Sequence, residues 1–169
     1  MSDFQPRRLR LGEVIAGASG ALLLIFLFAL KWYALSGSLS QTAPNVGAAT
    51  SWTGWTGLNH LRWFLLLTSL AALALAFFQA SQRAPAIPVT LSVVVTVLGV
   101  LSVLALIYRV LISPPSGAGV GQRPGAYLGL VAAIGIAYGG YRSMREEAGT
   151  DLQARGQIET VRIREPAGS

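Results

Sequence analysis

Residues 14–30 read VIAGASGALLLIFLFAL, a run of seventeen residues without a charge. Three further uncharged runs lie at residues 63–82, 84–108 and 124–141, and they contain eighteen to twenty-five residues each. A helix needs roughly 20 apolar residues to cross the ~30 Å hydrocarbon layer of a bilayer. None of the runs alternates polar and apolar residues, so strands of a membrane barrel are not expected. The four runs therefore predict four transmembrane helices.

The composition of the whole chain agrees with a membrane protein. Of its 169 residues, 53% are hydrophobic and only 12% are charged, whereas a soluble domain carries about 25% charged residues. We therefore expect an all-α integral membrane four-helix bundle in residues 1–143. Residues 144–169 hold most of the acidic residues and are expected to form a polar, disordered cytoplasmic tail. The four helices are expected over about residues 13–35, 61–81, 88–112 and 124–143.

Basic residues set the expected orientation, because cytoplasmic loops of membrane proteins are enriched in Lys and Arg. The chain has thirteen such residues. If both termini are cytoplasmic, the four on the outer side are Lys31, Arg62, Arg109 and Arg123. The other nine then lie inside, which favours cytoplasmic termini. In this orientation an outer interfacial belt would contain all four tryptophans, Trp32, Trp52, Trp55 and Trp63.

A second interpretation of the first run is a cleaved signal peptide. The basic segment RRLR at residues 7–10 precedes a Leu- and Phe-rich run, and Ala34-Leu35-Ser36 has the composition of a cleavage site. However, the bulky residues 31–33, KWY, directly follow the apolar run, where the boundary of a membrane helix is expected. We therefore expect the segment to be retained as a span.

Small residues predict how the helices pack, because close packing replaces apolar burial as the force between helices in lipid. At 100° per residue, Gly125, Gly129 and Gly139 fall on one side of the last helix. Gly17 and Gly20 share one face of the first helix. We expect these two faces to meet as a helix-packing seam. A homodimer contact is the alternative use of the glycine face.

Charged residues at the expected membrane boundaries are a second group of candidates. Long charged side chains near a helix end can extend toward the headgroups, so anchoring is the expected role. A bound lipid headgroup or an ion path is the alternative, because ionisable residues within a membrane often serve function. These boundary residues are Glu13, Lys31, Arg62 and Arg109.

Few residues could carry catalysis. The chain has no cysteine, one histidine and seven carboxylates, none of which lies near the middle of a span. A zinc site needs three or four ligands, and His60 has no carboxylate near it in the sequence. We therefore expect no catalytic residue, no metal and no cofactor. The net charge of +6 comes from basic residues that flank spans, so a nucleic-acid partner is not expected.

The first outer loop, residues 36–59, is uncharged and carries Trp52 and Trp55. Flexible linkers seldom retain tryptophan, because water disfavours its large apolar ring. These rings are therefore expected in the outer interface, as a cap on the bundle, or in contact with a membrane-protein partner, since tryptophan is enriched at binding hot spots.

The third helix aligns Ser92, Thr96 and Ser102 on one side. Such hydroxyls usually bond their own backbone or a neighbouring helix. The other interpretation is a polar path for a solute.

Four stretches of the chain carry a resemblance to a known group. They are RLRLGEVIAGASGALLLIFLFALKWY at residues 8–33, SWTGW at 51–55, IYRVLISPP at 107–115 and RPGAYLGLVAAIGIAYGGYRSMREE at 123–147. In this order they resemble uncharacterised small four-helix integral membrane proteins of actinobacteria. The resemblance implies a multi-pass protein of the bacterial plasma membrane. It assigns no role to any residue.

The function expected from the sequence is non-enzymatic. The protein would be a structural or partner-binding component of the bacterial cell envelope, in contact with the lipid bilayer and with a membrane protein or a second copy of the chain. A small transporter or channel is the alternative, with its path along Ser92, Thr96 and Ser102.

Overall fold

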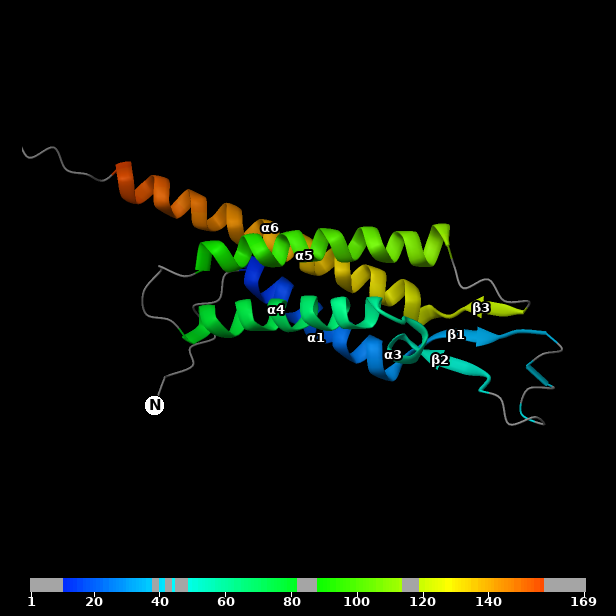
Figure 1. Cartoon of the computed structure of the whole chain (residues 1–169). Coiled ribbons are helices and arrows are strands. Elements are labelled where there is room, and N and C mark those ends of the chain that lie inside the picture. The colour runs from blue at the N-terminus through cyan, green and yellow to red at the C-terminus, as the bar shows by residue number, and fades with distance from the viewer. Residues whose placement is uncertain are drawn as a thin grey trace, which may run out of the picture.

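The computed structural model describes residues 11–37, 40–41, 44, 49–81, 88–113 and 119–156. Four long helices run alongside one another and form most of the molecule (Figure 1). They are α1 (Leu11–Ala29), α4 (Leu61–Ser81), α5 (Pro88–Ile107) and α6 (Pro124–Gly156). A turn of π-helix, η3 (Tyr108–Ile112), extends α5, and a short helix, α3 (Gly54–Gly57), precedes α4. Proline, which suits the first position of a helix, begins both α5 and α6.

Three of the helical segments are long and apolar enough to cross a membrane, namely Leu11–Ala29, Leu61–Ala80 and Leu91–Ile112. They coincide with three of the four spans predicted from the uncharged runs, which indicates a multi-pass membrane protein. α6 is longer than the expected span over residues 124–143, because the helix continues to Gly156. The rest of the expected tail, residues 157–169, lies outside the described residues.

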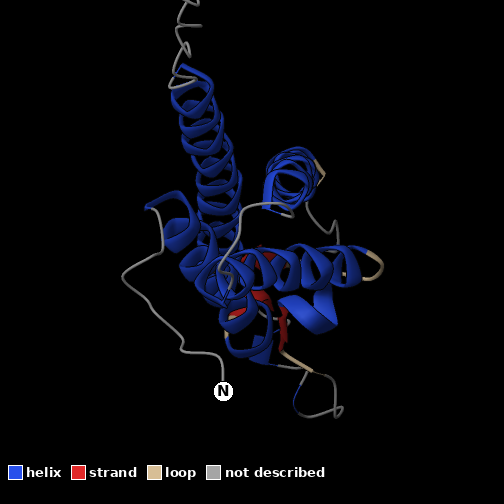
Figure 2. Cartoon of the chain, turned by 90° about the vertical axis from the view of Figure 1, so that its left-hand side faces the viewer, coloured by secondary structure: helices blue, strands red, loops and turns tan. Residues whose placement is uncertain are grey.

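A small antiparallel sheet lies at one end of the bundle (Figure 1). Its central strand, β1 (Lys31–Leu35), pairs with β2 (Ser51–Thr53) on one side and with β3 (Val120–Gln122) on the other. The prediction that the first helix continues to residue 35 is therefore wrong, because the chain leaves α1 after Ala29 and becomes extended. Figure 2, turned by 90°, shows the helices in front of the strands.

Two glycines allow the turns that flank the sheet. Gly37, just after β1, has φ +70°, and Gly119, just before β3, has φ +84°. Residues with a side chain rarely adopt this backbone conformation, whereas glycine adopts it without a steric cost. The backbone N–H of Ser36 donates to the Gly119 carbonyl at 2.5 Å. This hydrogen bond extends the pairing of β1 with β3 as far as Gly119, where the positive φ requires glycine.

α1 and α6 run antiparallel and touch along the full length of α1. Gly125 of α6 lies against the backbone of Lys31, Gly135 against Ser19, and Gly139 against Ala16. At the other end of the pair, a Cβ on Gly12 would lie 2.5 Å from the backbone nitrogen of Ser143. The glycines therefore let two backbones approach more closely than any side chain would permit.

The glycine face of α1 meets a different helix from the one expected. A Cβ on Gly17 would lie 2.6 Å from the Ala76 Cβ, and one on Gly20 would lie 3.0 Å from the Ala72 Cβ. Both alanines belong to α4. The expectation that Gly17 and Gly20 face the last helix is therefore wrong, because α6 packs on the neighbouring side of α1, at Gly12 and Ala16.

The outward faces of the four long helices are apolar. Each exposes large hydrophobic side chains, such as Ile25 on α1, Phe77 on α4, Leu104 on α5 and Val131 on α6. Val131 is 63% exposed. Continuous apolar exposure of this kind is unfavourable in water and normal in lipid. The interior of the bundle is filled by leucine, isoleucine, valine and alanine side chains.

Candidate functional site

The features of the chain that suggest a function gather at the end of the bundle that carries the sheet. We call this region the sheet end, and it comprises β1, β2, β3, α3 and the helix ends that adjoin them. It contains the four tryptophans and the basic residues Lys31, Arg62, Arg109 and Arg123. The opposite end contains Glu13 and Glu146.

Trp32 forms the centre of the sheet end. Its side chain is fully buried, and its indole N–H donates to the Phe26 carbonyl at 2.7 Å. Three glycines border the indole: a Cβ would lie 2.7 Å from the ring at Gly54, 2.9 Å at Gly125 and 2.5 Å at Gly129. The prediction that Trp32 belongs to an interfacial belt is wrong, because the fold encloses the ring between α3 and α6.

Trp55 belongs to a cluster of aromatic rings around one arginine. Its ring stacks on Phe28 at 4.8 Å and meets Trp63 edge-on at 5.1 Å. The Arg62 guanidinium lies 5.2 Å from the Trp55 ring centre and donates to the Trp55 carbonyl at 3.4 Å. Trp63 is 57% exposed. The cluster therefore joins the segment after β2 to the ends of α1 and α4.

Trp52 lies in β2 and is half-buried against the hydrophobic core. The candidate partner contacts Trp52 and Trp55 are thus partly covered by the chain itself. Each presents only part of its ring to the surroundings.

Tyr33 of β1 is buried, and the charge of Arg109 in η3 acts on its phenol. Tyr33 is 2% exposed, and its hydroxyl has no hydrogen-bond partner among the described residues. Burial raises the pKa of the Tyr33 phenol above its ordinary value, and the positive charge of Arg109 acts more weakly in the opposite direction. Arg109 also donates to the Ser113 carbonyl at 3.2 Å. The Arg109 guanidinium is therefore bonded to the backbone just after η3.

Glu13 differs from the expectation for a boundary residue. Its side chain is only 2% exposed, so it lies within the bundle and does not extend toward the headgroups. It lies in the first turn of α1, beside Gly12, which abuts Ser143 of α6. The interpretation of Glu13 as an extended anchor is wrong, because close packing of α1 against its neighbours encloses the carboxylate.

The three residues suggested for a solute path take part in hydrogen bonds inside the bundle. Thr96 donates to the Ser92 carbonyl at 2.7 Å, and the Ser102 hydroxyl lies 2.9 Å from that of Thr68 on α4. Ser92 and Ser102 are fully buried. These bonds are the ones that hydroxyls commonly form when helices pack in lipid, so the geometry favours the packing interpretation.

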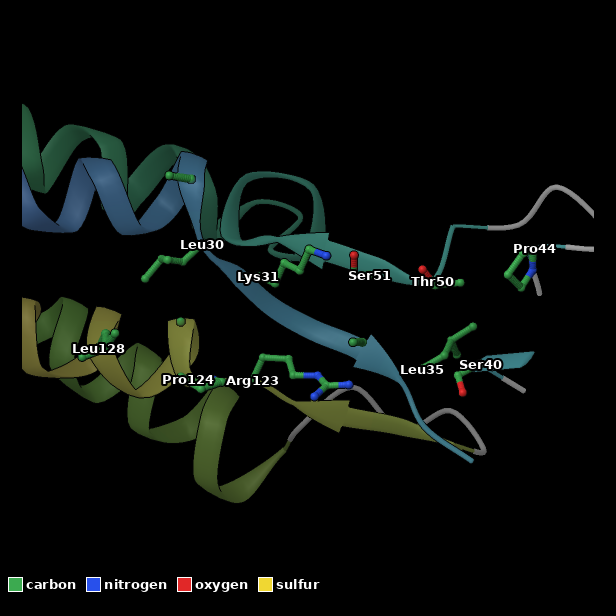
Figure 3. Close-up of a pocket in the computed structure, with 13 residues that line it drawn as sticks. Leu30, Lys31, Leu35, Ser40, Pro44, Thr50, Ser51, Arg123, Pro124 and Leu128 are labelled. Carbon is green, nitrogen blue, oxygen red and sulfur yellow. The ribbon is translucent and has the colours of Figure 1, made fainter. Parts of the chain in front are cut away.

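An open hollow of about 780 Å³ lies beside β1 and the start of α6. Figure 3 shows the basic side chains of Lys31 and Arg123 extending from the helix ends along the sheet. Leu30 and Leu128 line the helix side of the hollow, and Ser51 lines the sheet side. The hollow thus has an apolar part next to the helices and a cationic part next to the strands.

In the part of the chain that the structure describes, no group of three or more His, Cys, Asp or Glu residues could hold a metal ion. Comparison with protein-family models, curated proteins and solved structures finds no match. The resemblance to the actinobacterial group stays a prediction from the sequence stretches that carry it.

Proposed function

We propose that α6 crosses the membrane next to α1, which makes this a four-span protein. The observation that carries the proposal is the antiparallel contact of residues 125–143 with α1 over the whole of its length. Nineteen helical residues span about 28 Å, close to the thickness of the hydrocarbon layer. The outward side of this part of α6 carries Tyr127, Val131, Ile134 and Tyr138, all exposed and uncharged.

With four spans, both ends of the chain lie on the same side of the membrane. The excess of basic residues near the two ends supports their placement on the cytoplasmic side of the plasma membrane. The sheet end then lies on the outer side. This arrangement is open to a direct test, because the chain has no native cysteine.

We expect a cysteine at Ser40 to react with an impermeant maleimide in intact cells. A cysteine at Gly149 should react only after the membrane is permeabilised, because the sheet end and the end of α6 lie on opposite sides. Each variant carries a single cysteine in an otherwise identical chain, so the labelling of the two variants can be compared directly once their expression levels are matched. Labelling of both in intact cells would contradict the fourth span, and labelling of Gly149 alone would reverse the orientation.

The proposed activity is non-enzymatic: the protein acts as a structural or partner-binding component of the bacterial cell envelope. The packing of the bundle supports this, since apolar side chains and glycine contacts fill the space between the helices. The Thr96 hydroxyl donates to the Ser92 carbonyl, and the Ser102 hydroxyl bonds to that of Thr68. These contacts favour helix packing over a solute path. The partner surface proposed is the sheet end around Trp52 and Trp55.

Replacing Trp52 and Trp55 together with alanine should remove a specific co-purifying protein from an affinity eluate of the native membrane. The rings of both residues are partly exposed at the sheet end, where a partner could contact them. Phe77→Ala is the control, because its exposed ring lies near the opposite end of α4, away from the sheet end. Circular dichroism should show that the helices persist in both variants. An unchanged eluate would contradict the role of this surface in partner binding.

A further inference from the structure

The distribution of charge along the chain leaves the sheet end without carboxylates. No Asp or Glu occurs between Glu13 and Glu146, and both of these residues belong to the opposite end of the bundle. Four basic residues nevertheless lie at the sheet end, namely Lys31, Arg62, Arg109 and Arg123. Among the described residues, no carboxylate lies at the sheet end to neutralise these four charges.

Two of the four basic residues already have partners. Arg62 donates to the Trp55 carbonyl and lies against two indole rings, and Arg109 donates to the Ser113 carbonyl. Lys31 and Arg123, by contrast, are exposed and form no side-chain hydrogen bond or ion pair with any described residue. These two side chains are available to bind an anion.

The fold holds Lys31 and Arg123 next to each other. Lys31 is the first residue of β1, and Arg123 directly precedes α6. The backbone N–H of Arg123 donates to the Trp32 carbonyl at 2.9 Å, which fixes the start of α6 beside the start of β1. Both side chains line the same hollow (Figure 3). Two cations from segments far apart in the sequence thus converge on one open site.

The rest of the hollow suggests what kind of anion fits. Leu30, Ala29 and Leu128 line the side that adjoins the helices, and Leu128 is exposed on the outer face of α6. This apolar side lies at the end of the helical segments that cross the membrane, while the cations lie toward the sheet. An amphiphile with an anionic phosphate head and an apolar chain matches this arrangement. Its phosphate would contact the cations near the sheet, and its chain would contact the leucines near the helices.

We propose that the hollow binds the phosphate headgroup of an anionic phospholipid, with Lys31 and Arg123 contacting the phosphate and Leu30 and Leu128 contacting the upper part of an acyl chain. Zwitterionic lipids carry a positive group next to the phosphate, and two adjacent cations disfavour it. The site is therefore selective for net negative charge. Its chemistry is the same on either side of the membrane, so the inference does not depend on the orientation of the chain.

The test measures binding of short-chain phosphatidylglycerol to the full-length protein in a non-ionic detergent, with native mass spectrometry to count bound lipids. Short-chain phosphatidylcholine and inorganic phosphate are the comparison ligands. Loss of both cations in the double variant K31Q/R123Q should weaken phosphatidylglycerol binding about thirtyfold. The control R142Q/R145Q removes the same charge at the opposite end of the bundle and should leave this binding within about twofold.

A second variant tests the apolar side of the hollow, and its result is informative even if K31Q/R123Q does not fold. Leu128→Trp should obstruct the acyl chain and weaken phosphatidylglycerol binding while leaving phosphate binding unchanged. Equal binding of phosphatidylcholine and phosphatidylglycerol would overturn the proposed selectivity. Unchanged affinity in K31Q/R123Q would overturn the site. Binding of phosphate alone as tightly as the lipid would show an anion site with no role for the chain, and would also overturn the proposal.

Discussion

Trp32→Ala is expected to lower the free energy of unfolding by about 4 kcal/mol, the usual cost of truncating a fully buried tryptophan. The indole is completely enclosed and lies where α1, α3 and α6 meet. Its removal leaves a cavity between rigid backbones, because Gly54, Gly125 and Gly129 have no side chains that could refill the space. It also removes the hydrogen bond to the Phe26 carbonyl.

The effect can be measured as a melting temperature in detergent, followed by circular dichroism at 222 nm. For a chain of this size a change of 1 kcal/mol shifts the melting temperature by about 2–4 °C, so we expect a decrease of about 10 °C. Trp63→Ala is the matched control, since the same truncation there affects a ring that is 57% exposed. Equal decreases in the two variants would contradict a central role for Trp32.

A double-mutant cycle with Gly129 makes this prediction more specific. In the wild-type protein, Gly129→Ala places a Cβ 2.5 Å from the Trp32 ring and should be destabilising. In the Trp32→Ala background the same change meets empty space and should be neutral or stabilising, because alanine favours the helix over glycine by up to about 1 kcal/mol. The same sign in both backgrounds would show that the two residues are not coupled.

The spans followed from the sequence because lipid imposes a simple requirement. Every backbone polar group must be bonded within the membrane, and this selects long uncharged helices. Residues 61–81 and 88–112 were therefore predicted close to their bounds in the structure. The strand at residues 31–35 was missed, because Lys31, Trp32 and Tyr33 suit a helix boundary and a strand equally. Only its pairing with residues 51–53 and 120–122, far along the chain, decides between them.

The helical periodicity identified residues that share a face but not the helix that each face meets. Gly17 and Gly20 do share a face, and it contacts α4. A pattern of 100° per residue contains no information on the order of helices around a bundle, which depends on loop paths and on side-chain fit. For the same reason, the contact of Gly125 and Gly129 with the ring of Trp32 could not be predicted from the sequence.

The hollow beside β1 could be recognised in the sequence only in part. The absence of acidic residues between Glu13 and Glu146 is visible without a structure, and it already indicates unpaired basic residues. The proximity of Lys31 to Arg123 cannot be predicted from the sequence, because it depends on the hydrogen bond between the Arg123 backbone and Trp32. The sequence placed Arg123 only among the basic residues of the outer side and did not identify it as part of a site.

A close backbone approach of α1 and α6 leads to the second large effect, in the variant Gly139→Ala. A Cβ at Gly139 would lie well inside contact distance of the Ala16 amide nitrogen, and 2.8 Å from both the Ala16 Cα and the Gly12 carbonyl oxygen. All three are backbone atoms, so no rotation of a side chain can relieve the clash. The two helices must separate, and we expect the free energy of unfolding to fall by about 2–3 kcal/mol.

Gly149→Ala is the matched control, because it makes the same chemical change in the same helix. Nothing lies within 4 Å of the Cβ that it would add, so only the greater helix propensity of alanine remains. We expect no loss of stability and a gain of up to about 1 kcal/mol. The two variants should thus shift the detergent melting temperature in opposite directions, with Gly139→Ala lower by about 5–10 °C. A decrease for both would point to a general effect of replacing glycine in α6, whereas no decrease for Gly139→Ala would show that α1 and α6 do not approach this closely.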